Sequence, residues 1–164
     1  MTLDDYISFD EVRAALGVSI DEIEDTTLSL DLYAFHLVSE LEGVSDTLIA
    51  DYAAQKETPP GGWTAIQTRF HQTLRVFCVY AVAKQALVSL PMFAPKEQTD
   101  GKAGVVRFAL DPYKSTIAGV NRAYDSARAR LAAAYGAVVS IAPVVLSRPY
   151  MAVANPNFDP VKGG

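Results

Sequence analysis

Apolar side chains recur at alternating intervals of four and three residues across residues 113–138, and the repeat contains no irregularity. Its members are Tyr113, Ile117, Val120, Tyr124, Ala127, Leu131, Ala134 and Val138. This spacing predicts an α-helix with one narrow apolar seam, which is typical of packing against a single long partner helix. Asp111 is a favourable N-cap and Pro112 a favourable first helical residue, while Gly136 is a candidate stop before the seam ends.

A partner helix is predicted over residues 63–89. Thr64 and Gln67 form a capping box at its start, and Pro91 is expected to end it. Its apolar stripe consists of Trp63, Ile66, Phe70, Leu74, Phe77, Ala81 and Val88. We expect the two helices to lie antiparallel, joined across residues 90–110.

Two capping boxes lie close together near the start of the chain. SFDE (residues 8–11) predicts a short helix that Gly17 ends, and SIDE (residues 19–22) predicts a helix that runs to about Leu41 and is ended by Gly43. Apolar residues of this second helix form two stripes: Ile23, Thr27, Leu30, Ala34, Leu37 and Leu41, and beside them Leu28, Leu32 and Phe35. Because the stripes span a wide arc, we expect the helix to be covered on more than one side.

A further short helix is predicted over residues 45–56, and TPPGG (residues 58–62) predicts a break after it. A chain of 164 residues fits one domain with one core. The pattern therefore predicts an all-α fold, an antiparallel helical bundle of about four to five helices, within residues 1–141.

The segment EQTDGKAGVVRF (residues 97–108) interrupts the two long helices. Asp100 and Gly101 indicate a tight turn, and the residues after them alternate as in a strand, so we expect a small β-like hairpin or loop near 97–110. We interpret it as a projecting element that docks a partner; the alternative is an ordinary loop that buries Phe108 over the helix ends. The candidate docking residues are Asp100, Gly101, Lys102, Arg107 and Phe108.

Residues 142–164 have no helical period and contain four prolines, yet they keep large apolar side chains. A disordered tail would be more polar, so we expect an extended C-terminal arm that lies on its own domain or on a neighbouring chain. The candidate docking residues of the arm are Val145, Leu146, Arg148, Tyr150, Met151 and Phe158.

Charge is divided unequally along the chain. Residues 1–60 hold fourteen acids and two bases, a net charge of −12, whereas residues 61–164 hold five acids and twelve bases, a net charge of +7. Surfaces of opposite sign can pack together within one monomer, or they can favour head-to-tail association between monomers. The candidate inter-subunit residues are Asp21, Glu24, Asp25 and Asp31 on an acidic face, and Arg122, Arg128 and Arg130 on a basic face.

The sequence contains no recognisable catalytic or cofactor motif. His36, His71 and Cys78 lack metal-ligand spacing, and Cys78 lies in an apolar run that predicts a core position. There is no phosphate-binding loop and no nucleophile elbow. The basic residues of the last helix could contact nucleic acid, but a pI near 4.9 disfavours it. We therefore expect no catalytic residues, no metal and no cofactor.

The sequence does not predict a membrane protein. The longest apolar run, residues 76–83, has eight residues, whereas a helix needs roughly 20 to span a bilayer. Residues 1–6 carry acids where a signal peptide would carry bases. We expect a soluble protein.

Several stretches resemble the head–tail connector (adaptor) proteins of tailed bacteriophages. SFDEVRAALGVSIDEIEDTTLSLDL (residues 8–32) is similar to their opening short helix and acidic-apolar helix. TDGKAGVVRF (99–108) and DPYKSTIAGVNRAYDSARARL (111–131) resemble their connecting segment and closing helix, and NFDPVKGG (157–164) resembles their ending. The chain departs from the smallest members by extra material around 43–62 and by its lengthened third helix.

This resemblance implies a virion protein of the phage neck, assembled in the host cytoplasm. Such proteins form a ring, usually of twelve copies, beneath the portal protein and provide a platform for a stopper or tail component. DNA passes through the central channel without sequence-specific binding. The alternative function is a small helical protein-binding or regulatory module, present as a monomer or dimer.

Overall fold

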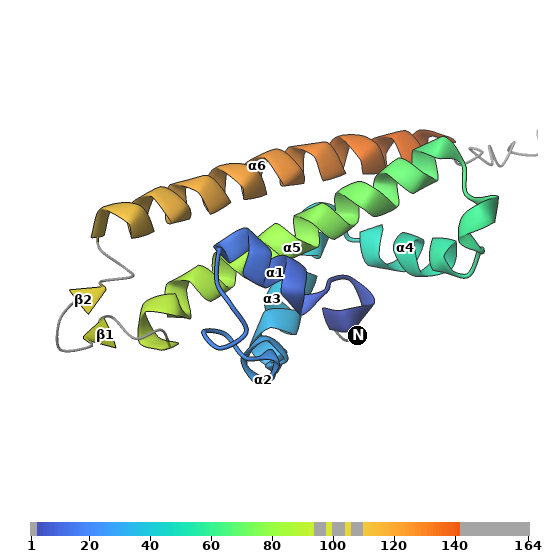
Figure 1. Ribbon diagram of the computed structural model, residues 1–164. Coiled ribbons are helices and arrows are strands. Elements are labelled where there is room, and N and C mark those ends of the chain that lie inside the picture. Colours follow the sequence, from blue (N-terminus) through green and yellow to red (C-terminus); the bar gives the residue numbers. More distant parts are fainter. Residues whose placement is uncertain (1–2, 94–97, 100–103, 106–109, 142–164) are drawn as a thin grey trace, which may run out of the picture.

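The computed structural model describes residues 3–93, 98–99, 104–105 and 110–141 (Figure 1). These residues form an all-α protein. Their helices are η1 (Leu3–Asp5), α1 (Phe9–Leu16), α2 (Asp25–Leu28), α3 (Asp31–Glu42), α4 (Leu48–Lys56), η2 (Pro60–Gly62), α5 (Ala65–Phe93) and α6 (Leu110–Ile141), where η denotes a 3₁₀ turn.

The two long helices, α5 and α6, run antiparallel and side by side (Figure 1). The seam predicted for α6 faces α5: Val120, Tyr124, Ala127, Leu131 and Ala134 are buried, and Ile117 and Val138 are partly buried. On α5 the buried residues of the predicted stripe are Phe70, Leu74, Phe77 and Ala81. The sequence prediction of this pair is confirmed, although Ile66 and Val88 are exposed.

The predicted ends of the long helices are wrong in three places. α5 continues past Pro91 to Phe93, since a proline in the last turn removes only one backbone hydrogen bond of a long helix. α6 begins at Leu110, so Asp111 and Pro112 lie inside its first turn. Gly136 does not stop α6, because the buried side chains of Ala134 and Tyr135 hold that turn against the core.

α1 confirms the prediction made for residues 8–17. Both halves of the capping box are present: the backbone N–H of Ser8 donates to the Glu11 side chain, and the backbone N–H of Glu11 faces the Ser8 side chain. Gly17 ends the helix with φ of 70°, a left-handed conformation that glycine adopts without steric cost. The short helix predicted over residues 45–56 is α4, and η2 lies at the predicted break.

The single helix predicted from Ser19 to Leu41 is wrong. Glu22 Oε2 accepts the backbone N–H of Ser19 at 2.7 Å, as in one half of a capping box, but the Glu22 N–H bonds the backbone oxygen of Ser19 and the segment closes only a turn. The backbone is extended at Glu24, which separates the turn from α2, and again at Leu30, which separates α2 from α3. These breaks allow Ile23, Leu28 and Tyr33 to be buried together. Gly43 is the C-cap of α3, so the helix ends where predicted, and it does so with φ of −65°.

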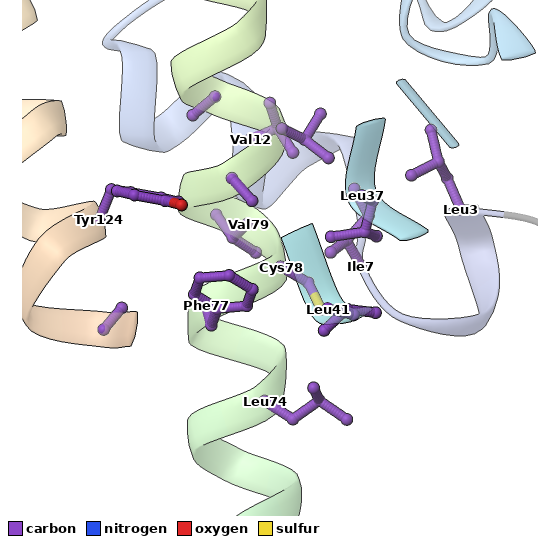
Figure 2. Close-up of a cluster of buried hydrophobic side chains, with 14 of the residues drawn as sticks. Leu3, Ile7, Val12, Leu37, Leu41, Leu74, Phe77, Cys78, Val79 and Tyr124 are labelled. Atoms are coloured by element: carbon purple, nitrogen blue, oxygen red, sulfur yellow. The ribbon is translucent and has the colours of Figure 1, made fainter. Parts of the chain in front are cut away.

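The core lies between α5 and the elements packed on it, namely α6 along one side and α1 and α3 along another (Figures 1 and 2). Cys78 is fully buried there, as predicted, and burial raises the pKa of its thiol. Two tyrosines of α6 connect this helix to the first part of the chain: Tyr124 donates a hydrogen bond to Glu40 of α3, and Tyr135 donates one to Asp51 of α4. Burial, followed by the bond to Glu40, raises the pKa of Tyr124 to about 12.

Two short strands lie between α5 and α6. β1 (Gln98–Thr99) pairs antiparallel with β2 (Gly104–Val105), so that Gln98 faces Val105 and Thr99 faces Gly104. The predicted turn at Asp100 and Gly101 and the residues 106–109 lie outside the described residues, so the hairpin as a whole stays a prediction. The arm, residues 142–164, also lies outside them. No helix of the described part of the chain is both long and apolar enough to cross a membrane.

Candidate functional site

The predicted acidic residues are at the surface of the protein. We call Asp21, Glu24, Asp25 and Asp31 the acidic surface; all four are exposed. They belong to the turn before α2, to α2 and to the start of α3. In Figure 1, α2 lies on the opposite side of α5 from α6.

A buried arginine of α1 holds this surface in place. The guanidinium of Arg13 donates to the backbone oxygen of Ile23 at 3.2 Å and to Asp25 Oδ1 at 2.6 Å. It also donates to Asp10 Oδ1 at 2.6 Å. The hydrogen bonds to Asp10 and Asp25 raise the pKa of Arg13. Asp25 therefore has a structural partner within its own chain.

The solvent side of α3 bears on the expectation that this helix is covered on more than one side, because Leu32 and Phe35 of the second predicted stripe are exposed. We define the α3 outer face as its exposed residues Asp31, Leu32, Phe35, Ser39 and Glu42. Phe35 is 71% exposed and Leu32 58% exposed. The face thus carries two large apolar side chains and two carboxylates. In the sequence, Leu32 and Phe35 have the helical spacing that is also typical of buried residues.

The predicted basic residues are also at the surface, on α6. Arg122, Arg128 and Arg130 are all exposed. Arg128 Nη2 donates to the backbone oxygen of Gly43 at 3.1 Å, which ties α6 to the end of α3. Arg122 and Arg130 are therefore the better candidates for a contact with another molecule.

A shallow apolar groove, not foreseen from the sequence, lies between α1 and α5. This α1–α5 groove has a volume of about 430 Å³, and its lining residues are Glu11, Ala14, Ala15, Arg75, Val76, Val79 and Tyr80. Val76 is 48% exposed within it. Arg75 Nη2 lies 2.9 Å from Glu11 Oε1 at its border. Val76 also lines a smaller hollow of about 120 Å³ with Ala127 and Arg130 of α6, so the groove continues toward the basic residues.

An aromatic pocket of about 540 Å³ lies on the other side of Arg75, lined in part by Tyr6, Tyr52, Trp63 and His71. The rings of Trp63 and His71 stack with centroids 3.9 Å apart and an angle of 7°. Burial lowers the pKa of His71. No local pattern in the sequence indicates this cluster, because its members come from separate segments of the chain.

The free energy of unfolding is expected to decrease at pH values under about 6.5, in part because of His71. Above the ordinary histidine pKa of about 6.5, His71 is neutral in folded and unfolded chains. Below it, the unfolded chain binds a proton that folded His71 resists, so the free energy of unfolding decreases. Denaturant titrations would measure the free energy of unfolding at pH 7.5 and at pH 5.0. The decrease between the two pH values should be smaller for His71→Phe, which keeps a ring against Trp63, than for the wild type. Equal losses would contradict this prediction.

The described residues contain no group of three or more His, Cys, Asp or Glu that could hold a metal ion. His36 Nε2 lies 3.6 Å from Glu40 Oε1, and that carboxylate group also accepts the hydrogen bond of Tyr124. The loop and arm residues predicted to dock a partner lie outside the described residues. The sites that the structure offers are therefore the two charged surfaces, the α3 outer face, the groove and the aromatic pocket.

No protein family matches the chain, and neither a curated protein nor a solved structure matches it significantly. The class of protein therefore has to be inferred from the chain itself. Its fold and surfaces define an all-α protein with unlike acidic and basic surfaces and an apolar helix face open to solvent.

Proposed function

We propose that the chain is the ring-forming subunit of a head–tail connector in the neck of a tailed bacteriophage. The observation that carries the proposal is the presence of two unlike exposed surfaces: the acidic surface around α2, and the exposed arginines of α6, a helix that lies across α5 from α2 in Figure 1. The resemblance of residues 8–32 and 111–131 to this class of protein agrees with it.

Unlike surfaces are what a ring requires. In a ring each subunit presents one surface to the neighbour before it and a different surface to the neighbour after it. Attraction between carboxylates and guanidinium groups would orient each subunit during association. Leu32 and Phe35 supply apolar area beside the carboxylates, as the core of an interface does.

The ring would dock beneath the portal protein and present a platform to a stopper or tail-completion protein, with the loop near 97–110 and the arm from 142 as docking segments. DNA would pass through the channel. A net charge of −5 suits passage, because strong phosphate binding would hold the DNA in place.

Charge reversal on the two surfaces tests the proposal. The acidic variant carries Asp21→Lys and Asp31→Lys, and the basic variant carries Arg122→Glu and Arg130→Glu; Asp25 and Arg128 are left because each bonds within its own chain. We expect the wild type to form rings, either alone or on the portal protein of the same genome. Each variant alone should fail to form them, and an equimolar mixture should recover them, because every contact in the mixture again joins opposite charges.

Negative-stain electron microscopy and mass photometry would measure the rings, at low and high salt, since ionic screening should weaken them. A matched control, Asp46→Lys with Glu57→Lys, makes the same change in net charge at exposed positions outside the acidic surface and should leave the rings intact. If each variant alone forms rings as well as the wild type, the charged contact is wrong. If the wild type never forms rings, with or without the portal, the proposed function is wrong.

The aromatic pocket favours a second function, a helical binding module that acts as a monomer or dimer. A pocket of about 540 Å³ lined by aromatic rings is within the size range of small-ligand sites. The same microscopy distinguishes the two functions, because a binding module would stay small and leave the portal undecorated.

A further inference from the structure

We propose that the α3 outer face of one copy inserts Leu32 and Phe35 into the α1–α5 groove of the next copy. This inference rests on the proposed function, because it assigns the contact between neighbouring subunits of the ring. It goes further by naming an apolar contact that neither the charge pattern nor the resemblance contains.

The inserting part is a pair of side chains one helical turn apart. Leu32 and Phe35 are separated by three residues and therefore share one side of α3. Tyr33, Leu37 and Leu41, on the other side of the same helix, are buried and fix α3 against the rest of the core. The exposed pair is thus held on a rigid support, as a side chain that anchors an interface needs to be.

The receiving part is apolar and open. Ala14 and Ala15 of α1 and Val76 and Val79 of α5 line the groove, and the two alanines leave space that larger residues would fill. With a volume of about 430 Å³, the groove is within the range of pockets that take organic ligands, so it has room for a large side chain. Val76 remains 48% exposed, which leaves apolar area for a partner to cover.

The charges around the two parts are complementary. Asp31 lies four residues before Phe35, and Glu42 lies seven after it, so exposed carboxylates stand on both sides of the aromatic ring. Around the groove stand exposed Arg75 and Arg130, both of which line its hollows. Arg69 is exposed too and lies two helical turns before Val76 on the same side of α5. Glu11 is the acid at the groove, and it is paired with Arg75.

The two parts belong to different elements, since α3 supplies the inserting residues and α1, α5 and α6 supply the groove. A contact between unlike parts leaves one of each free after every association step, so it continues until the chain of subunits closes. The occupant of the groove is therefore a second copy of this chain.

Engineered cysteines test this contact. The full-length protein with Phe35→Cys and Val76→Cys is oxidised at the concentration at which it assembles and examined on a non-reducing gel. We expect a ladder of covalent oligomers, no oligomers from either single variant, and only dimers from a mixture of the two. The buried native Cys78 should not react. The matched control pairs Phe35→Cys with Val88→Cys, which is exposed on the same helix about 18 Å from Val76 and should give no ladder.

A second variant measures the same contact without cysteines. Phe35→Ala should keep the circular dichroism spectrum of the wild type and raise the concentration needed for assembly by about tenfold or more. An unchanged assembly concentration would overturn the inference.

The outcomes separate this inference from the proposed function. Dimers from Phe35→Cys alone would mean that α3 faces meet each other, and rings on the portal without the ladder would place the contact elsewhere; both overturn the inference, and the second leaves the proposed function standing. A ladder made of open filaments that never bind the portal would support the contact and overturn the function. A protein that never associates would overturn both.

Discussion

Phe77→Ala is expected to lower the free energy of unfolding by about 3–5 kcal/mol, the largest stability loss that we predict for a single substitution. Phe77 has no exposed surface and lies at the centre of the contact between α5 and α6, with its ring centroid 5.6 Å from that of Tyr124 (Figure 2). Removing the ring loses its transfer free energy and leaves a cavity between two long helices that cannot easily close around it.

Equilibrium denaturation in urea, followed by circular dichroism, would measure this loss at a protein concentration too low for assembly. Since small domains are stable by only about 5–15 kcal/mol, a large part of the chains could be unfolded before denaturant is added. The matched control is Val88→Ala on the same helix, because Val88 is 76% exposed and its truncation should change stability by less than about 0.5 kcal/mol. A loss below about 1 kcal/mol for Phe77→Ala would contradict the packing described for α5 and α6.

Arg13→Ala is expected to destabilise the protein by about 2–3 kcal/mol, chiefly through the lost charged hydrogen bonds and the unpaired oxygen of Ile23. The side chain of Arg13 is 7% exposed, whereas those of Asp10 and Asp25 are 86% and 58% exposed. The two carboxylates can regain water when the guanidinium is removed, so the loss should be smaller than for a fully buried ion pair.

Three further variants divide the Arg13 effect among its contacts. Asp10→Asn should cost less than about 1 kcal/mol, because exposed ion pairs contribute little. Asp25→Asn should cost somewhat more, and Arg13→Lys should fall between wild type and alanine, since one ammonium group cannot reach all three partners. The same denaturation assay applies. If Asp10→Asn costs as much as Arg13→Ala, the attachment of Ile23 is not the main contribution.

The parts of the fold that could be predicted from sequence are those whose signals are local. The four-three spacing in residues 113–138 and the stripe through Phe77 reflect the period of the helix itself, and both correspond to buried surfaces. The capping box at Ser8 and the left-handed Gly17 depend on neighbouring backbone atoms, and both were found. Such features do not depend on what the rest of the chain does.

The region between Ser19 and Leu41 shows what local signals cannot supply. Its helical spacing is compatible with one long helix, but tertiary contacts favour an interrupted helix, in which Arg13 donates to the backbone oxygen of Ile23. Whether Leu32 and Phe35 point into a core or into solvent depends on which side of α3 contacts α5, and spacing does not encode that choice. The groove and the aromatic pocket are assembled from distant segments, so no short pattern could indicate them.

The candidate docking segments in the loop and the arm stay predictions. Lys102, Arg107 and the apolar residues of the arm belong to segments whose pattern does not fit a helical core, and they lie outside the described residues. All the residues of the charged faces are exposed; Arg128 and Asp25 are also hydrogen-bonded within the chain, and the inter-subunit role of Arg122, Arg130, Asp21 and Asp31 stays a prediction.

The hydrogen bonds of Tyr124 to Glu40 and of Tyr135 to Asp51 each join residues 84 positions apart. A ribosome that adds about 5–20 residues per second needs roughly 4–17 s to make that stretch of chain. During this interval the nascent first part of the chain has no α6 to complete its core, and side chains that α6 would cover remain in contact with solvent. The first part of the chain therefore waits for α6 before its core is complete, and a chain truncated before Tyr124 lacks both tyrosine links.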